Sequence, residues 1–175
     1  MTFIHQTQLN DSDEATQALF SRHQKHYGFL PNYTKLYKNR VGVMDAWSTL
    51  QNTIKSNVKP HEFKLVTLAA AMAIKNSYCS LAYAQMLNSN YYDENELKKI
   101  VFEKGEGILT ERQMLIMSLA KKVAIDANTV TQQDINNLKE VGCTDEDIFD
   151  VVTVAAARCF FGKIHDALGA QPDPV

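Results

Sequence analysis

The prediction of an all-helical protein begins with Leu65-Val-Thr-Leu-Ala-Ala-Ala-Met-Ala-Ile74, one of the two most apolar parts of the chain. This run is shorter than the roughly 20 residues that a membrane-spanning helix needs, so it predicts a helix buried in a protein core. Pro60 precedes it, at a position that the first turn of a helix tolerates. Asn76 and Ser77 follow it, and because both are favourable caps they predict a further helix over 78–87.

Three helices are expected before this run, because turn residues separate segments of helical length and alternating β-branched runs are almost absent. The first should begin at Asp11-Ser12 and end near Tyr27, where Gly28 can take the left-handed conformation that closes a helix. A short second helix should extend to Asn39. The third, over 42–57, has apolar residues at spacings of three and four that would face the core. They are Val43, Trp47, Leu50 and Ile54.

Further helices are expected over 93–104, 110–127, 131–141 and from Thr144 onward. Thr110-Glu-Arg-Gln113 matches a capping box, and Thr131-Gln-Gln-Asp134 resembles one. The last helix has a broad apolar side that should pack centrally against 65–74. That side consists of Ile148, Val151, Val152, Ala155, Cys159 and Phe160. The sequence therefore predicts an all-α fold of about eight helices in a single orthogonally packed bundle, with one domain over 1–175.

The composition argues against several functional classes. A net charge of -2 and the lack of a lysine or arginine cluster argue against binding to nucleic acid. The N-terminus, Met-Thr-Phe-Ile-His-Gln, does not resemble a secretory signal. The three cysteines, Cys79, Cys143 and Cys159, have no paired spacing, which argues against a disulfide framework and fits a reducing compartment. We therefore expect a cytoplasmic protein that is not embedded in a membrane.

The motifs of the chain predict neither a metal nor a cofactor. The five histidines make no recognised metal-binding spacing with carboxylates or cysteines. They are His5, His23, His26, His61 and His165. A Gly-rich phosphate loop, a Gly-x-Ser-x-Gly elbow and a dinucleotide fingerprint are also absent from the sequence. Any catalysis is therefore expected to depend on the side chains of the protein alone.

A longer segment that contains the apolar run carries a signal of its own: Glu62-Phe-Lys-Leu-Val-Thr-Leu-Ala-Ala-Ala-Met-Ala-Ile-Lys-Asn-Ser-Tyr-Cys79-Ser-Leu-Ala-Tyr83. It resembles the signature of the alkyl hydroperoxidase D and carboxymuconolactone decarboxylase family. In that family an acidic residue starts a buried helix, and a Cys-x-x-Cys pair with a histidine four residues later opens the next. Gly28-Phe-Leu-Pro-Asn-Tyr33, Ala46-Trp47 and Thr131 to Asp173 resemble other parts of the family. The resemblance implies its helical fold and a homo-oligomer, a trimer or hexamer.

The resemblance also assigns a candidate site of five residues. Cys79 takes the position of the second, nucleophilic cysteine, and Asn76 stands where the first cysteine would be. Tyr83 occupies the position of the histidine. Lys64 lies where the catalytic glutamate of the family is usual, and Glu62 is two residues away. The motif therefore lacks the partner with which the nucleophilic cysteine of the family forms a disulfide.

Cys79 is also singled out by its predicted place in the first turn of a helix. Unpaired amide donors and the helix dipole favour a thiolate there, which predicts a lowered pKa. Lys64 or Lys75 would add positive charge, and Tyr83, one turn away on the same face, would donate a hydrogen bond to a peroxide. The alternative interpretation is that Cys79 is a small buried hydrophobic residue.

Three functions fit these observations. The first is a thiol-dependent, peroxiredoxin-like antioxidant enzyme in which Cys79 attacks a peroxide and an external thiol, Cys159 or Cys143 regenerates it. The second is a non-catalytic oligomeric binding module on the same fold. The third is a cofactor-free decarboxylase or isomerase of a small carboxylate or lactone, in which Lys64, Tyr83 and His61 bind the carboxylate or move a proton.

Overall fold

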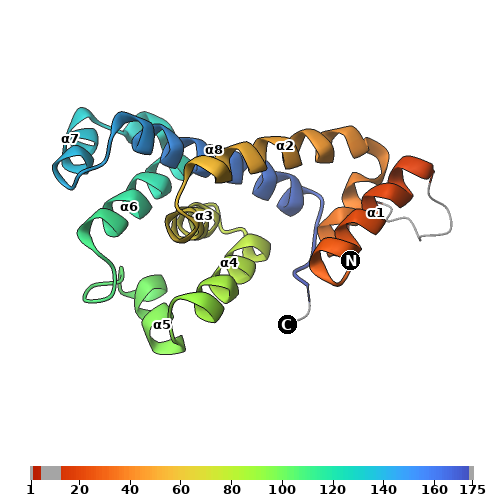
Figure 1. Ribbon diagram of the computed structural model, residues 1–175, viewed down its shortest axis with the longest axis horizontal. Coiled ribbons are helices and arrows are strands. Elements are labelled where there is room, and N and C mark those ends of the chain that lie inside the picture. The colour runs from red at the N-terminus through yellow and green to blue at the C-terminus, as the bar shows by residue number, and fades with distance from the viewer. Residues whose placement is uncertain (1, 5–12, 174–175) are drawn as a thin grey trace.

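The computed structural model describes residues 2–4 and 13–173, and in this part of the chain the backbone forms helices and no strand. The α-helices are α1 (Glu14–Tyr27), α2 (Val41–Asn57), α3 (Pro60–Ala73), α4 (Ser77–Asn90), α5 (Glu94–Phe102), α6 (Glu111–Asp126), α7 (Gln132–Glu140) and α8 (Asp145–Ala167) (Figure 1). The 310 helix η2 (Asn32–Arg40) precedes α2, and η3 (Ala127–Thr129) follows α6. The predicted all-α fold of about eight helices is confirmed.

Helix α3 is the centre of the fold, and the apolar run predicts its burial correctly. The side chains from Leu65 to Ala71 are almost completely excluded from solvent. Each leucine or valine buried in this way stabilises the fold by about 1.5–3 kcal/mol. Helices α4, α6 and α8 pack around α3, which Figure 1 shows nearly end-on between them. In the described part of the chain, no helix has both the length and the apolar character of a membrane span.

Two hydrophobic clusters make up the core, and α8 contributes to both. The larger cluster surrounds α3 and includes residues of α6, α7 and the first half of α8. The smaller cluster joins α1, η2 and α2 to the second half of α8 and is rich in aromatic rings. Its aromatic members are Phe20, Tyr33, Tyr37, Trp47, Tyr78 and Phe161. Cys79 belongs to the smaller cluster, so the candidate nucleophile lies where α4 meets the N-terminal helices.

The helix starts follow the capping chemistry of the sequence. Thr110, Thr131 and Thr144 each begin a helix with a complete capping box, in which the threonine accepts from the third backbone N–H of the helix. Pro60 lies at the start of α3, as predicted. Helix α1 is capped by Asp13, whose side chain accepts from the backbone N–H of Thr16 at 2.8 Å. The predicted start of this helix at Asp11 and Ser12 lies outside the described residues.

The predicted core-facing side of α2 is wrong for two of its four residues. Val43 and Leu50 are 40% and 46% exposed, whereas Trp47 and Ile54 are buried together with Met44. The apolar spacing of α2 allows two neighbouring stripes, and the helix is turned so that the second one, with polar residues between its apolar ones, faces the interior. Those polar residues, among them Ser48 and Gln51, line the cavity described below.

Helix α8 packs centrally against α3, as predicted, but its apolar side is narrower than expected. Ile148, Val151 and Ala155 are buried, whereas Phe160 is 48% exposed. The ring of Phe160 lies 5.7 Å from that of Trp47, so it covers the outer surface between α8 and α2. The prediction that Phe160 is a core residue is therefore wrong, because about half of its surface faces solvent.

Candidate active site

Cys79 lies in the first turn of α4, as predicted, and Asn76 fixes its backbone. The Asn76 side chain is fully buried and accepts a hydrogen bond from the backbone N–H of Cys79 at 2.7 Å. Its Nδ2 donates to the backbone oxygen of Gly162 at 3.2 Å and to Asp166 Oδ1 at 2.7 Å. Asn76 therefore caps α4 and ties the start of that helix to α8, which holds the cysteine in place.

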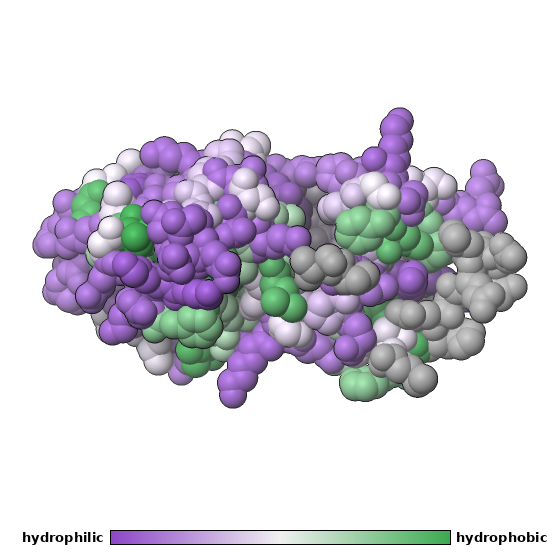
Figure 2. Space-filling view, turned by 90° about the horizontal axis from the view of Figure 1, so that it is seen from below, coloured by the Kyte–Doolittle hydropathy of each residue, from purple (hydrophilic) through white to green (hydrophobic). Residues whose placement is uncertain are grey.

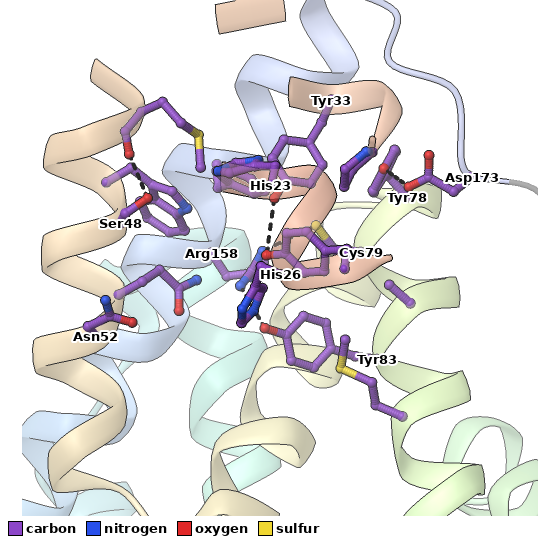
Figure 3. Close-up of a pocket in the computed structure, with 18 of the residues that line it drawn as sticks. His23, His26, Tyr33, Ser48, Asn52, Tyr78, Cys79, Tyr83, Arg158 and Asp173 are labelled. Atoms are coloured by element: carbon purple, nitrogen blue, oxygen red, sulfur yellow. Dashed lines mark hydrogen bonds between the residues drawn. The ribbon is translucent and has the colours of Figure 1, made fainter. Parts of the chain in front are cut away.

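A buried arginine, Arg158 of α8, connects Cys79 with Tyr83. Its Nη1 donates to Cys79 Sγ at 3.2 Å, and its Nη2 donates to the hydroxyl oxygen of Tyr83 at 3.2 Å. Figure 3 shows Cys79 and Tyr83 coming from α4 and meeting Arg158 in the pocket. Only 3% of the Arg158 residue is exposed. Of the five predicted site residues, the structure thus brings Cys79, Tyr83 and Asn76 together.

Arg158 is a residue of this candidate site that the sequence does not predict. The available signal is a single cation inside the apolar run from Val151 to Phe161. A charged side chain in such a run is almost never buried without a partner, so a partner for Arg158 is expected. The partner, Cys79, lies 79 positions earlier in the chain. The two residues meet only because α8 packs against α4, which the sequence alone does not show.

The prediction of a lowered pKa for Cys79 is wrong in direction. Burial raises the pKa of the Cys79 thiol above its ordinary value, while the charge and the hydrogen bond of Arg158 act in the opposite direction without outweighing it. The sulfur is excluded from solvent, with the residue only 2% exposed. The thiol is therefore mostly protonated in the resting protein, and Arg158 limits the cost of forming the thiolate.

The other two polar groups of the site respond to burial in different ways. Burial raises the pKa of Tyr83, although Arg158 opposes this rise, so the phenol stays protonated near neutral pH. For Arg158, burial alone would lower the pKa, but Tyr83 and Cys79 outweigh it, so the pKa of the guanidinium is raised. The site therefore combines a protonated phenol with a permanent positive charge beside the sulfur.

These residues line a cavity of about 360 Å³ between α1, α2, α4 and α8. Its walls include Trp47, Gln51 and Lys55 of α2 opposite Cys79 and Tyr83 of α4. Figure 3 shows Ser48 and Asn52 on the α2 side of this space, and Figure 2 shows a recess in the corresponding part of the molecular surface. Cavities of a few hundred Å³ suit small molecules. The sulfur of Cys79 is thus sealed from bulk water but lies in the wall of a pocket.

Glu62 and Lys64 do not join this site. Glu62 accepts from Arg112 Nε at 3.0 Å and from Arg112 Nη2 at 3.2 Å, and the same guanidinium pairs with Asp147 at 3.2 Å. This cluster connects α3 with α6 and α8. Lys64 Nζ donates to the backbone oxygen of Pro60 at 3.2 Å and lies over the Tyr91 ring, at 5.1 Å from its centre. Neither side chain lines the cavity. Although the resemblance assigns Glu62 and Lys64 to the site, both instead make contacts that hold helices together.

The remaining cysteines point away from Cys79. The three cysteines are all described, and all are free thiols. Cys143 Sγ accepts from Arg112 Nη1 at 3.1 Å, in the turn after Gly142, whose φ of 83° is left-handed. Cys159 Sγ faces α6, 3.9 Å from the backbone oxygen of Ala124. Although Cys159 follows Arg158 in the sequence, successive helical side chains point in different directions, so only Arg158 reaches Cys79.

The histidines also have structural contacts. His23 is buried, and its Nδ1 lies 2.8 Å from the Thr34 hydroxyl. His61 stacks on Tyr91, with ring centres 4.3 Å apart, and does not line the cavity. Within residues 2–4 and 13–173, no group of three or more His, Cys, Asp or Glu side chains is placed to hold a metal ion. His5 lies outside the described residues.

Comparison with known proteins identifies the fold through solved structures. The sequence matches no family model and no curated protein. An uncharacterized peroxidase-related protein of Ralstonia eutropha JMP134, described as an alkylhydroperoxidase AhpD core, has a TM-score of 0.85 and 19% identity, covering 98% of this chain and 92% of that one. A peroxidase-related protein of Silicibacter sp. TM1040 has the same TM-score and 20% identity, with the same coverage.

A third similar structure is that of the debrominase Bmp8, a cysteine-to-alanine variant of which was solved in complex with 2,3,4-tribromopyrrole. Its TM-score is 0.80 at 13% identity, and the match covers 99% of this chain and 92% of that chain. Proteins described by different activities thus share this arrangement of helices. The chain has the AhpD-like fold, as the resemblance of its Glu62–Tyr83 segment predicts.

Proposed function

We propose that this protein is a thiol-dependent peroxide reductase in which Cys79 is the nucleophile. The observation that carries the proposal is the contact between Cys79 Sγ and the buried, charged Arg158 in the wall of a cavity. A thiolate is the reactive form of cysteine, and a neighbouring cation stabilises it. The description of two similar structures as peroxidase-related supports the same class of chemistry.

The proposed reaction consumes one peroxide and two thiols. The Cys79 thiolate attacks the terminal oxygen of a hydroperoxide ROOH, the O–O bond breaks, and a proton goes to the leaving oxygen, which gives ROH and a sulfenic acid on Cys79. An external thiol R'SH then forms a mixed disulfide with Cys79 and releases water. A second R'SH releases Cys79 and leaves as R'SSR'. The peroxide is reduced, and the external thiol is oxidised.

Tyr83 and Arg158 have complementary roles in this scheme. The Tyr83 oxygen accepts from Arg158, which leaves its own O–H available to donate to a peroxide oxygen. Because burial raises the pKa of Tyr83, that proton is present near neutral pH. Arg158 stabilises the thiolate before the attack. Tyr83 thus takes the position of the family histidine but acts as a hydrogen-bond donor, since a protonated phenol is a poor base.

The reductant is assigned to an external thiol, because neither other cysteine faces Cys79. Cys159 Sγ contacts α6 and Cys143 Sγ contacts Arg112. Sulfenic acids without a neighbouring cysteine are resolved by thiols from solution. Such a thiol would approach the sulfur through the cavity that Cys79 lines.

The test is peroxide consumption by the full chain with a dithiol reductant. We expect Cys79→Ser to abolish consumption, while Cys143→Ser and Cys159→Ser retain it as matched controls. If Cys79→Ser consumes peroxide as fast as the unchanged protein, the proposal is wrong. Turnover of a small carboxylate or lactone that survives Cys79→Ser would instead identify the cofactor-free decarboxylase. Absence of every turnover, with ligand binding retained, would identify the non-catalytic binding module.

Reductive debromination is a second candidate, favoured by the similarity to the debrominase Bmp8. Here Cys79 and an external thiol would convert Ar–Br and two R'SH into Ar–H, HBr and R'SSR'. Both reactions need the same nucleophile and the same reductant. Release of bromide from brominated pyrroles, measured beside peroxide consumption, distinguishes the two reactions.

A further inference from the structure

The cavity beside Cys79 contains an incompletely bonded cation. Arg158 donates from Nη1 to Cys79 and from Nη2 to Tyr83, but its buried Nε has no hydrogen-bond partner. A buried arginine normally pairs with a carboxylate, because an uncompensated buried charge is costly. Among residues 2–4 and 13–173, no carboxylate lies within ion-pair distance of Arg158.

Lys55 adds a second cation to the same space. It lines the cavity from α2, and no described carboxylate pairs with it. Its amine lies 5.5 Å from the centre of the Phe63 ring. Although the side chain is exposed, partial burial lowers the pKa of Lys55, and repulsion by Arg158 lowers it further. Lys55 and Arg158 thus line the same cavity.

The acidic side chains near the cavity are already bonded elsewhere. Asp173 lines the cavity, but its carboxylate accepts from the Tyr78 hydroxyl and from the backbone N–H of Asn32. Asp45 pairs with Arg22 at the rim. Arg158 and Lys55 thus remain as positive charges without a protein counter-ion in the described structure.

The other walls of the cavity define the rest of a ligand. Arg158 lies over the rings of Trp47, Tyr83 and Phe161, at 5.8, 5.0 and 5.3 Å from their centres, so aromatic surface flanks the cation. Gln51 Oε1, on the α2 side, is buried without a hydrogen-bond partner. The cavity volume of about 360 Å³ is in the range of pockets that bind small organic molecules.

We infer that this cavity binds a small organic acid with an aromatic or apolar body, whose carboxylate is held by Arg158 and Lys55. The apolar body lies against Trp47, and a hydroxyl group of the ligand donates to Gln51 Oε1. The inference rests on the proposed function in one respect: it gives the preferred substrate as a hydroperoxide that carries a carboxylate. The Nε of Arg158 then completes a set of three contacts, with thiol, phenol and substrate each on a different N–H group.

Trp47 provides a direct reporter, because it is the only tryptophan of the chain and it lines the cavity. The probes are benzoate and benzamide, which have nearly the same shape and differ in charge. We expect benzoate to change the Trp47 fluorescence and to bind about tenfold or more tightly than benzamide, since a hydrogen bond to a charged group is worth at least that ratio. Equal affinity of the two probes would overturn the inference.

Three variants place the binding in the cavity. Arg158→Met and Lys55→Met should each remove most of the preference for benzoate, whereas Lys163→Met, an exposed cation on the same helix as Arg158, should leave it unchanged. A preference that survives both cavity substitutions means that benzoate binds elsewhere, which also overturns the inference. Lys55 is at the rim, so its variant tests the site even if Arg158→Met does not fold.

Cys79→Ser separates this inference from the proposed function. The variant lacks the nucleophile but keeps both cations, so it should bind benzoate as the unchanged protein does while it consumes no peroxide. If the unchanged protein consumes peroxide but does not prefer benzoate over benzamide, the inferred carboxylate ligand alone is rejected. Binding of benzoate without any thiol-dependent turnover in the unchanged protein would reject the peroxidase alone.

Discussion

At the scale of single residues, the site depends on the pairing of a buried guanidinium with a thiol. Arg158 has no carboxylate within ion-pair distance in the described structure, and its two terminal nitrogens contact Cys79 and Tyr83. A thiolate on Cys79 would supply the counter-charge that the arginine lacks. Burial of the sulfur opposes this state, as the raised pKa of Cys79 shows. Reactivity therefore reflects a balance between burial and one positive charge.

Removing that charge should slow the thiol. Arg158→Met keeps an unbranched side chain but removes the charge, and it raises the pKa of Cys79 further because both effects of Arg158 on this pKa lower it. At a fixed pH near neutrality, the thiolate fraction and the rate of iodoacetamide alkylation should then fall by about tenfold for each unit of pKa. Lys163→Met is the matched control on α8. Equal alkylation rates in all three proteins would show that Arg158 does not activate the thiol.

The sequence predicts the position of Cys79 correctly and its ionisation incorrectly, for one reason. Helix starts are determined by local residues, so Asn76 predicts the cap that places Cys79 in the first turn of α4. The pKa depends on solvent exclusion by α1, α2 and α8, and Arg158 is brought there by contacts between distant parts of the chain. The residues around Cys79 in the sequence predict neither its burial nor its contact with Arg158.

At the scale of helices, Asn76 joins two elements and does more than an ordinary cap. Asn76→Ala removes the cap of Cys79 and also leaves the backbone oxygen of Gly162 and the carboxylate of Asp166 without their donor. We expect a loss of about 3 kcal/mol in the free energy of unfolding, measured with urea. Asp93→Ala removes an exposed cap of α5 and should cost about 1 kcal/mol. Equal losses would contradict the connecting role of Asn76.

The helix boundaries were predictable, and the side of each helix that faces the core was predictable only in part. Thr110, Thr131 and Thr144 begin helices as their capping boxes indicate, because the bonds involved span three residues. The orientation of α2 was not predictable from the spacing of Val43 and Leu50. Two apolar stripes compete on this helix, and the choice between them depends on packing against α8 and on the cavity.

At the scale of the whole molecule, two buried histidines couple folding to pH. Burial lowers the pKa of His165 to about 3, and burial with repulsion from Arg22 lowers the pKa of His23 to about 4. Both are therefore neutral in the folded protein, whereas the unfolded chain binds protons below about pH 6.5. The fold loses stability as the pH falls from about 6.5 towards these lowered values, because protons then favour the unfolded state.

The expected loss is about 1.4 kcal/mol per pH unit for each of these histidines, measured by urea unfolding between about pH 6 and pH 5. His165→Phe should reduce the slope by the contribution of one histidine, about 1.4 kcal/mol per pH unit. Phenylalanine keeps a ring among the aromatic side chains that surround His165, so the variant should still fold. An unchanged slope in this variant would mean that His165 is protonated in the folded protein.

The assembly of the molecule stays a prediction. The resemblance implies a trimer or hexamer, and exposed apolar side chains of α2 and α8, among them Val43, Leu50 and Phe160, are available for contacts between subunits. Light scattering by the full chain should give the mass of three or six copies. A monomer at the concentrations used for activity would contradict this expectation.

The most direct test of the central claim, that Cys79 is the reactive group of the cavity, is to locate the oxidised sulfur. The full chain is treated with a slight excess of peroxide in the presence of dimedone, which traps sulfenic acids, and the adduct is located by peptide mass spectrometry. We predict the adduct on Cys79, with Cys143 and Cys159 unmodified. An unmodified Cys79, or equal modification of all three cysteines, would contradict the account.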